Sequence, residues 1–388
     1  MRTLARAAAG ALLLSVLGSV SLPAAGKPRA RDLGVPFEGT PGPENAITDV
    51  AGVEVGHTTL ISGEGKLVVG KGPVRTGVTA VLPRGRESSR DAVFAGWFSQ
   101  NGNGEMTGTT WIEESGFLEG PLLLTNTHSV GVVRDAAIAW RVKQGTPDAS
   151  GYWWSLPVVA ETWDGFLNDI NGFHVKPEHV FQALSSAAGG PVPEGNVGGG
   201  TGMICYEFKG GIGTSSRRLS AKAGGYTVGA LVQCNCGRRS QLLVAGAPVG
   251  VEIPGTVYGE DTGSIIIVLA TDAPLLPHQL KRLARRATMG LARTGSTSGN
   301  GSGDIFLAFS TANPKAWTAT EAVGVQMVPN DAMNPLFEAS VQATEEAIVN
   351  AMVGAETMTG IDGHKAESLP HDRLRTALKK YNRLAVSP

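Results

Sequence analysis

The fold is decided by an apolar run with a single serine at its start: Gly263-Ser264-Ile265-Ile266-Ile267-Val268-Leu269-Ala270. A continuous apolar run of this length, which stops at Asp272-Ala273-Pro274, predicts a strand that is buried on both faces. A polar, turn-like stretch, residues 258–263, precedes it. A Gly-Ser pair before a strand is ordinary turn punctuation. Local pattern alone therefore does not make Ser264 a candidate functional residue, and the evidence for that role comes from the rest of the chain.

Composition limits the function classes that the chain can belong to. The 388 residues are 42% hydrophobic and 17% charged, which is typical of a well-packed globular protein. The net charge is −1, so nothing favours nucleic acid or an acidic membrane surface as a partner. The seven histidines show no ligand-like spacing, and the sequence predicts no metal or cofactor.

The three cysteines do not form a disulfide framework. Cys234 and Cys236 fall in a segment that is expected to be a strand, where their side chains would share one face but lie too far apart for an easy bridge. We interpret both, together with Cys205, as small buried hydrophobic residues.

The N-terminus is typical of an export signal. Arg2 and Arg6 precede an apolar segment, and small residues follow it up to Ala25. The segment is short for a membrane span and a polar stretch follows, which predicts export to the periplasm or medium without a membrane anchor. The expected mature chain, residues 26–388, contains no low-complexity linker or fixed-period repeat, which favours a single domain.

Strand-like and helix-like segments alternate along the mature chain. Glycine-separated apolar runs and buried runs predict strands, and apolar residues at helical spacing predict helices. The expected strands include 53–55, 67–69, 78–82, 122–124, 227–232, 264–270 and 305–309; the expected helices include 177–187, 277–293, a long helix from 334 and a basic helix at 370–381. This order indicates layers of helices and more than one buried sheet.

Common catalytic signatures are missing from the sequence. It contains no Gly-x-Ser-x-Gly elbow, Ser-x-x-Lys motif, zinc-binding His-Glu-x-x-His or dinucleotide-binding Gly-x-Gly-x-x-Gly. A serine nucleophile in this chain therefore needs a base other than histidine. An α-amino group can serve, because its ordinary pKa of about 7.7–8.0 leaves a useful fraction neutral at neutral pH.

That amine would have to belong to the nucleophile's own residue, so the peptide bond before it must be cut. We interpret Ser264 as a latent N-terminal nucleophile, and Gly263 as a residue that lets the hydroxyl approach the carbonyl without side-chain obstruction. Activity should then fall at acid pH as the amine becomes protonated.

Several longer motifs occur in one order along the chain. They are 160–165 (Ala-Glu-Thr-Trp-Asp-Gly), 200–205 (Gly-Thr-Gly-Met-Ile-Cys), 210–215 (Gly-Gly-Ile-Gly-Thr-Ser), Asn235 in a strand-end turn, 263–277, and 301–304 (Gly-Ser-Gly-Asp). On these motifs the chain, from residue 45 to 311, resembles the DmpA-type serine aminopeptidases, including the β-peptidyl aminopeptidases.

The resemblance implies an α/β fold of four layers, an αββα sandwich similar to that of the ornithine acetyltransferases. It also implies autocleavage between Gly263 and Ser264. The products would be an α-chain, residues 26–263, and a β-chain, residues 264–388, that stay associated within a homo-oligomer, a tetramer of heterodimers.

The resemblance further implies a role for each site residue. Ser264 would be the nucleophile, and its new amine the base. Ser302 and Asp304 would orient and protonate that pair, while Asn235 would stabilise the oxyanion. Glu161 would hold the ammonium group of the substrate's first residue, although on local pattern alone it is more typical of a solvated loop acid.

The sequence departs from the family pattern at two positions. Trp163 stands where some members have tyrosine. An indole has no hydroxyl that could act there as a donor to the oxyanion, and this departure favours the β-peptidyl branch. Asp304 stands where some members have glutamate, which shortens the reach of the acid.

The expected substrates are short peptides, amides and esters with a free N-terminal amine. Their first residue would be a β-amino acid, with L-amino acids and D-amino acid amides or esters as further possibilities. Two alternatives stay open at this point: an acyltransferase of the ornithine acetyltransferase-like fold, for which the nucleophile would be threonine, and a non-catalytic binding protein that is not cut before Ser264.

Overall fold

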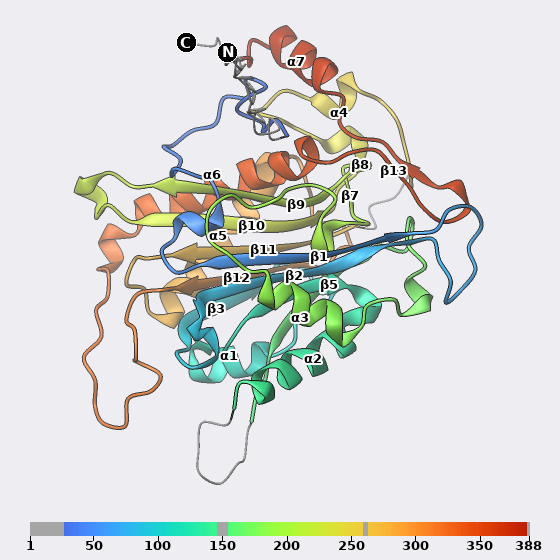
Figure 1. Ribbon diagram of the computed structural model, residues 1–388. Coiled ribbons are helices and arrows are strands. Elements are labelled where there is room, and N and C mark those ends of the chain that lie inside the picture. Colours follow the sequence, from blue (N-terminus) through green and yellow to red (C-terminus); the bar gives the residue numbers. More distant parts are fainter. Residues whose placement is uncertain (1–26, 146–153, 259–262, 386–388) are drawn as a thin grey trace, which may run out of the picture.

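The computed structural model describes residues 27–145, 154–258 and 263–385. The expected signal peptide and most of the turn-like stretch before Gly263 lie outside these residues. Two β-sheets pack face to face at the centre of the molecule (Figure 1). Within the described ranges, no helix has the length and apolar character needed to cross a membrane.

The smaller central sheet has four strands in the order β1-β2-β5-β6. Their bounds are β1 (Glu54–Ser62), β2 (Val74–Arg86), β5 (Leu122–Asn126) and β6 (Val158–Thr162). The strand expected at 67–69 is wrong: these residues belong to the turn between β1 and β2, and Val68 and Val69 are exposed. Two consecutive valines suggest a strand, but the flanking glycines and the β1–β2 hairpin register place them at the tip.

The larger central sheet has six strands in the order β4-β3-β12-β11-β10-β9. Their bounds are β3 (Val93–Ser99), β4 (Phe117–Leu118), β9 (Gly211–Arg218), β10 (Thr227–Asn235), β11 (Ser264–Thr271) and β12 (Asp304–Ser310). Strands β11 and β12 are parallel, and every other neighbouring pair in this sheet is antiparallel. Two small hairpins add β7 (Ile204–Cys205) with β8 (Phe208–Lys209), and β13 (Met358–Thr359) with β14 (Lys365–Ala366).

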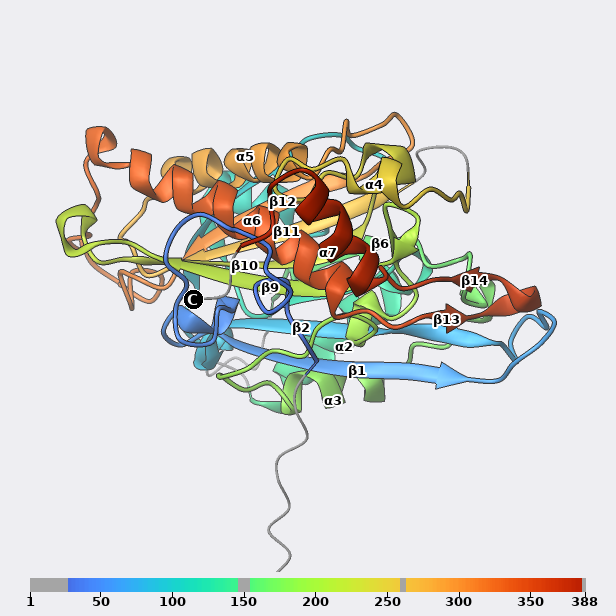
Figure 2. The ribbon, with the colours of Figure 1, turned by 90° about the horizontal axis from the view of Figure 1, so that it is seen from above.

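Helices cover the outer faces of both sheets. The helices within the described ranges are α1 (Thr109–Ser115), α2 (Val130–Lys143), α3 (Pro177–Ser185), α4 (Val249–Glu252), α5 (Pro277–Arg293), α6 (Asn334–Val353) and α7 (His371–Lys380). Helices α5 and α6 pack on the six-stranded sheet, and α2 and α3 pack on the four-stranded sheet. Figure 2 shows the two helical layers on opposite sides of the sheets. The expected four-layer αββα sandwich is confirmed.

Strand β11 shows why a continuous apolar run is needed at the centre. All eight of its residues are buried. Side chains alternate along a strand, so Ile265, Ile267 and Leu269 pack into the core beneath α5 and α6. Ile266 and Val268 pack into the core between the two sheets. Each face of β11 therefore meets its own apolar layer, as its sequence predicts.

Candidate active site

Ser264 is the first residue of β11 and lines a cavity of about 1000 Å³ at the end of the sheets. By strand alternation its side chain shares the face of Ile266, which is directed toward the four-stranded sheet. The Oγ atom accepts a hydrogen bond from the Gly303 backbone N–H at 3.1 Å. Only 5% of the Ser264 surface is exposed, and that residue borders the open space of the cavity.

Gly263 lies too close to the neighbouring strand for any side chain. A Cβ atom at this position would lie 2.3 Å from the carbonyl oxygen of Asn235 and 2.5 Å from Cα of Cys236. Because both contacts are with backbone atoms, a larger residue would force the chain to shift. This steric requirement is a more concrete reason for a glycine than the freedom of approach inferred from the sequence.

Asn235 is the register partner of Ser264 across β10 and β11. Its Oδ1 accepts the Ile204 backbone N–H at 2.8 Å, which orients the side-chain amide. Since the oxygen is committed to Ile204, the NH₂ group is the donor that remains for other partners. Asn235 is buried at the end of β10, beside the first residue of β11.

Ser302 and Asp304 form a buried pair on the loop that leads into β12. Ser302 Oγ donates to Asp304 Oδ1 at 2.6 Å, and the Asp304 backbone N–H donates to Asn101 Oδ1 at 2.8 Å. By strand alternation Asp304 shares the face of Phe306, on the helical side of the sheet. Asp304 is the register partner of Ile265. Its carboxylate therefore lies close to the start of β11, but on the opposite face of the sheet from the Ser264 side chain.

Glu161 lies at the end of β6 and is 3% exposed, so the interpretation as a solvated loop acid is wrong. Its Oε1 accepts a hydrogen bond from the Glu105 backbone N–H at 2.9 Å, and its Oε2 accepts one from the Thr127 hydroxyl at 2.5 Å. Burial raises the pKa of Glu161 above its ordinary value, and these two hydrogen bonds act in the opposite direction. A buried carboxylate that faces a cavity is suited to bind a cation.

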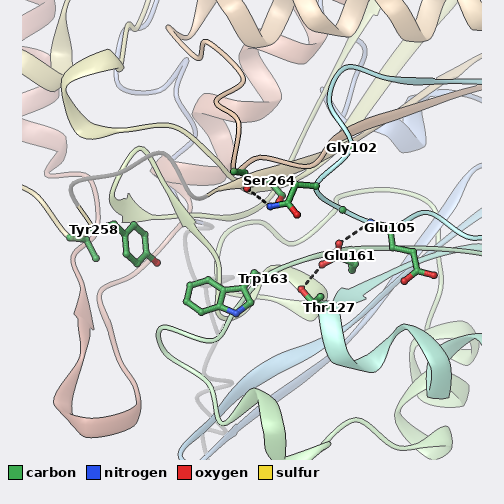
Figure 3. A pocket seen from close by; sticks show the side chains of 11 residues that line it. Gly102, Glu105, Thr127, Glu161, Trp163, Tyr258 and Ser264 are labelled. Atoms are coloured by element: carbon green, nitrogen blue, oxygen red, sulfur yellow. Dashed lines mark hydrogen bonds between the residues drawn. The ribbon is translucent and has the colours of Figure 1, made fainter.

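The opposite side of the cavity is aromatic. Figure 3 shows Trp163 between Glu161 and Tyr258, with Ser264 above them. The rings of Trp163 and Tyr258 have centroids 6.5 Å apart and are tilted by 56°. The cavity thus combines a serine hydroxyl, an acidic end and an apolar wall.

The structure brings together residues from both halves of the chain. Ser264, Glu161 and Trp163 line the cavity directly, whereas Asn235, Ser302 and Asp304 surround the start of β11 without being among the residues that line it. Sequence reasoning missed several lining residues: Asn103, Glu105, Thr127, Val257 and Tyr258. A signal existed for some of them, because polar residues follow the apolar runs that end near 98 and 124.

The three cysteines lie together behind Asn235, in the core beneath the helices. Cys236 Sγ lies 3.8 Å from Cys205 Sγ and 3.8 Å from Cys234 Sγ. All three are free thiols, buried as expected. Their sulfur atoms lie closer than an extended strand predicts, because β10 ends at Asn235. They are the one group in the described part of the chain with ligand atoms close enough to share a metal ion.

Two solved structures share this architecture over their whole length. The chain is 50% identical to the L-aminopeptidase D-Ala-esterase/amidase of Ochrobactrum anthropi, described as a prototype of the serine aminopeptidases with a variant of the Ntn hydrolase fold. The TM-score is 0.87, and the match covers 92% of this chain and 100% of that one. A β-aminopeptidase from Burkholderia sp. matches with a TM-score of 0.85 at 50% identity, over 93% of this chain and 100% of that one.

The fold and these matches define the class of the protein: it is a serine aminopeptidase with the fold of the N-terminal nucleophile hydrolases. The model of peptidase family S58 matches residues 45–366, and the chain belongs to that family. The β-peptidyl aminopeptidase BapA of Sphingosinicella microcystinivorans is 59% identical over 377 residues, which cover 93% of this chain and 94% of that protein. The acyltransferase and binding-protein alternatives are thereby set aside.

Proposed function

We propose that the protein is an exported aminopeptidase that cuts itself before Ser264 and then removes N-terminal residues, β-amino acids above all, from short peptides, amides and esters. The observation that carries this proposal is the shared cavity. Ser264, at the start of β11, and the buried carboxylate of Glu161 line the same space. A nucleophile and a cation site in one cavity suit a substrate with a free amine near its scissile carbonyl.

In this proposal the amine that cleavage exposes on Ser264 acts as the general base for its own hydroxyl. The amine takes the hydroxyl proton as Oγ attacks the substrate carbonyl, and returns it to the leaving amine, so that an acyl-enzyme forms on Ser264. Water then attacks this ester and releases the first residue. Strand β11 holds the nucleophile in place, because the Ile265 N–H is bonded to the Gly303 carbonyl and the ladder to β10 begins at Ser264.

Three further side chains would support this reaction. The oriented NH₂ group of Asn235 would donate to the oxyanion, and removal of a preorganised donor of this kind typically costs about 3–4 kcal/mol. The hydroxyl of Ser302, fixed by its bond to Asp304, would orient the new amine. This assignment makes Asp304 a positioning residue, since strand alternation puts its carboxylate on the other face of the sheet from the serine hydroxyl.

Substrate preference for β-amino acids rests on the relatives and on Trp163. The curated relative described above is named a β-peptidyl aminopeptidase, and one solved relative a β-aminopeptidase. Trp163 provides an apolar surface next to Glu161 where a phenol would add a polar group. L-amino acids and D-amino acid amides or esters remain part of the proposed substrate range.

Export and assembly complete the proposal. The N-terminal 25 residues have the pattern of a signal peptide, so the mature protein would be periplasmic or secreted. The net charge of −1 argues against a nucleic-acid partner. The α- and β-chains would stay associated, since β10 of one pairs with β11 of the other along eight residue pairs. We further propose a homo-oligomer, a tetramer of these heterodimers.

The proposal is tested by denaturing gel electrophoresis and N-terminal sequencing of the purified protein. We expect two fragments, the smaller one beginning Ser264-Ile265-Ile266. The variant Ser264→Ala should stay in one piece and release no product from a β-aminoacyl anilide. Wild-type protein that is active while still in one piece would refute the mechanism.

A further inference from the structure

Glu207 fixes the segment that leads toward the proposed cleavage site. Its Oε1 accepts hydrogen bonds from Thr256 Oγ1 at 3.2 Å, from the Val257 N–H at 3.0 Å and from the Tyr258 N–H at 2.9 Å. Its Oε2 accepts the Arg239 N–H at 3.1 Å. One buried carboxylate therefore holds three consecutive residues, and we call residues 256–258 the tail segment.

The Arg239 side chain fixes the backbone that carries this carboxylate. Its guanidinium donates to the backbone carbonyls of Tyr206, Glu207 and Ile253 and lies 3.3 Å from the ring centroid of Phe208. Burial lowers the pKa of Arg239 to about 10, so the group stays charged at neutral pH. A buried ion that is satisfied on several sides fixes the groups bonded to it.

The fixed tail segment places Tyr258 on the wall of the cavity. The Tyr258 ring packs edge-on against Phe166 with centroids 5.0 Å apart, and Phe166 in turn stacks on His364 at 4.5 Å. On its other side Tyr258 lies beside Trp163. Figure 3 shows Tyr258 on one side of Trp163 and Glu161 on the other. We call Trp163 and Tyr258, which both line the cavity, the aromatic wall.

The position of the wall indicates which part of a substrate it would contact. Trp163 follows Glu161 by two residues, so the wall begins next to the carboxylate that would bind the substrate's ammonium group. The group nearest to that ammonium is the side chain of the first residue. Aromatic surfaces favour apolar and aromatic partners over small or charged ones.

We propose that Tyr258 is a specificity-determining residue that packs against the side chain of the substrate's first residue, and that Glu207 is the positioning residue that keeps it there. This inference rests on the proposed function. Tyr258 lies five residues before Gly263 and would belong to the end of the α-chain after cleavage. Glu207 would thus retain a chain end as part of the substrate site.

Two series of β-aminoacyl substrates test the inference. In the first series the leaving group is always 4-nitroanilide, and the first residue carries a methyl, isobutyl or benzyl side chain. In the second series the first residue is constant and the leaving amine varies. Tyr258→Ala should lower the benzyl-to-methyl ratio of kcat/KM about tenfold, mainly through KM, and leave the ratios in the second series unchanged.

Further variants separate specificity from folding. Tyr258→Leu retains apolar bulk and should preserve the isobutyl rate if the alanine variant folds poorly. Glu207→Gln should shift the ratio in the same direction, because an amide offers one acceptor oxygen where the carboxylate offers two. Tyr381→Ala is the matched control, since this tyrosine is bonded to Glu252 on an exposed face, and it should leave both series unchanged.

The outcomes are distinguishable from failure of the proposed function. Sequencing of each variant shows whether the β-chain begins at Ser264. A processed, active Tyr258→Ala enzyme with the wild-type benzyl-to-methyl ratio would overturn the inference, and so would a change confined to the leaving-group series. Absence of cleavage in the wild-type protein would instead overturn the mechanism on which the inference rests.

Discussion

Replacement of Glu161 by glutamine tests the proposed amine site most directly. The carboxylate is 3% exposed, and each of its oxygens already accepts one hydrogen bond, from Glu105 N–H and from Thr127 Oγ1. The remaining lone pairs are available to a substrate ammonium group. Glutamine has a similar shape but lacks the charge, and it turns a donor toward one of the two existing donors.

The size of the effect follows from the burial of the carboxylate. Truncation of one partner of a buried, hydrogen-bonded charge pair costs about 2–5 kcal/mol. At 1.4 kcal/mol for each factor of ten, kcat/KM should fall between about 30-fold and about 4000-fold. The exposed Glu105 lines the same cavity, and Glu105→Gln is the matched control, with an expected loss below about fivefold.

The assay compares a β-aminoacyl 4-nitroanilide with an analogue in which hydrogen replaces the amine. The wild-type enzyme should prefer the amine-bearing substrate, and Glu161→Gln should lose most of that preference. Because burial raises the pKa of Glu161, protonation of this group should also contribute to the acid limb of the wild-type pH profile, and that contribution should vanish in the variant. An equal loss of rate on both substrates would show that Glu161 acts only on the structure, and would refute the reasoning.

Two other substitutions test the surroundings of the site. Gly263→Ala places a Cβ atom 2.3 Å from the Asn235 carbonyl oxygen, so we expect slower self-cleavage on a timed gel and a free energy of unfolding about 1–3 kcal/mol below that of the wild type. Gly324→Ala is the control, because a Cβ atom there meets nothing within 4 Å. Normal self-cleavage of both variants would contradict the steric argument. Burial raises the pKa of Asp164 to about 6 from its ordinary value of 3.8. The native state therefore holds a proton between about pH 4 and 6 that the unfolded chain releases, and the free energy of unfolding should fall by about 3 kcal/mol as the pH rises through that window and then level off. Asp164→Asn should flatten this slope in urea unfolding, and an unchanged slope would contradict the assignment.

Local pattern was sufficient to predict the central strand and the main helices. The apolar run after Ser264 predicts β11 because each face of that strand meets a separate apolar core. The stripe of apolar residues in 277–293 predicts α5 with its observed bounds. Local pattern fails at 67–69, where two valines lie at the exposed tip of a hairpin.

Sheet order could not be derived in this way. Strands β3 and β12 are neighbours although about 200 residues separate them in the sequence, and no local signal encodes such a pairing. The four-layer arrangement was predicted from the resemblance alone. The same limit applies to the cavity, where Thr127 and Tyr258 contribute through tertiary proximity to Glu161 and Trp163.

The structure gives a physical reason why self-cleavage at this position could produce a working site. On the N-terminal side of the Gly263–Ser264 peptide bond, Glu207 holds the tail segment through three hydrogen bonds. On the other side, β11 is paired with both of its neighbours from its first residues onward. Cleavage between two such anchors would free a chain end without releasing either flank. The new amine would then stay beside its own hydroxyl, which the Gly303 N–H already contacts, and proximity of this kind is what makes a weak base effective.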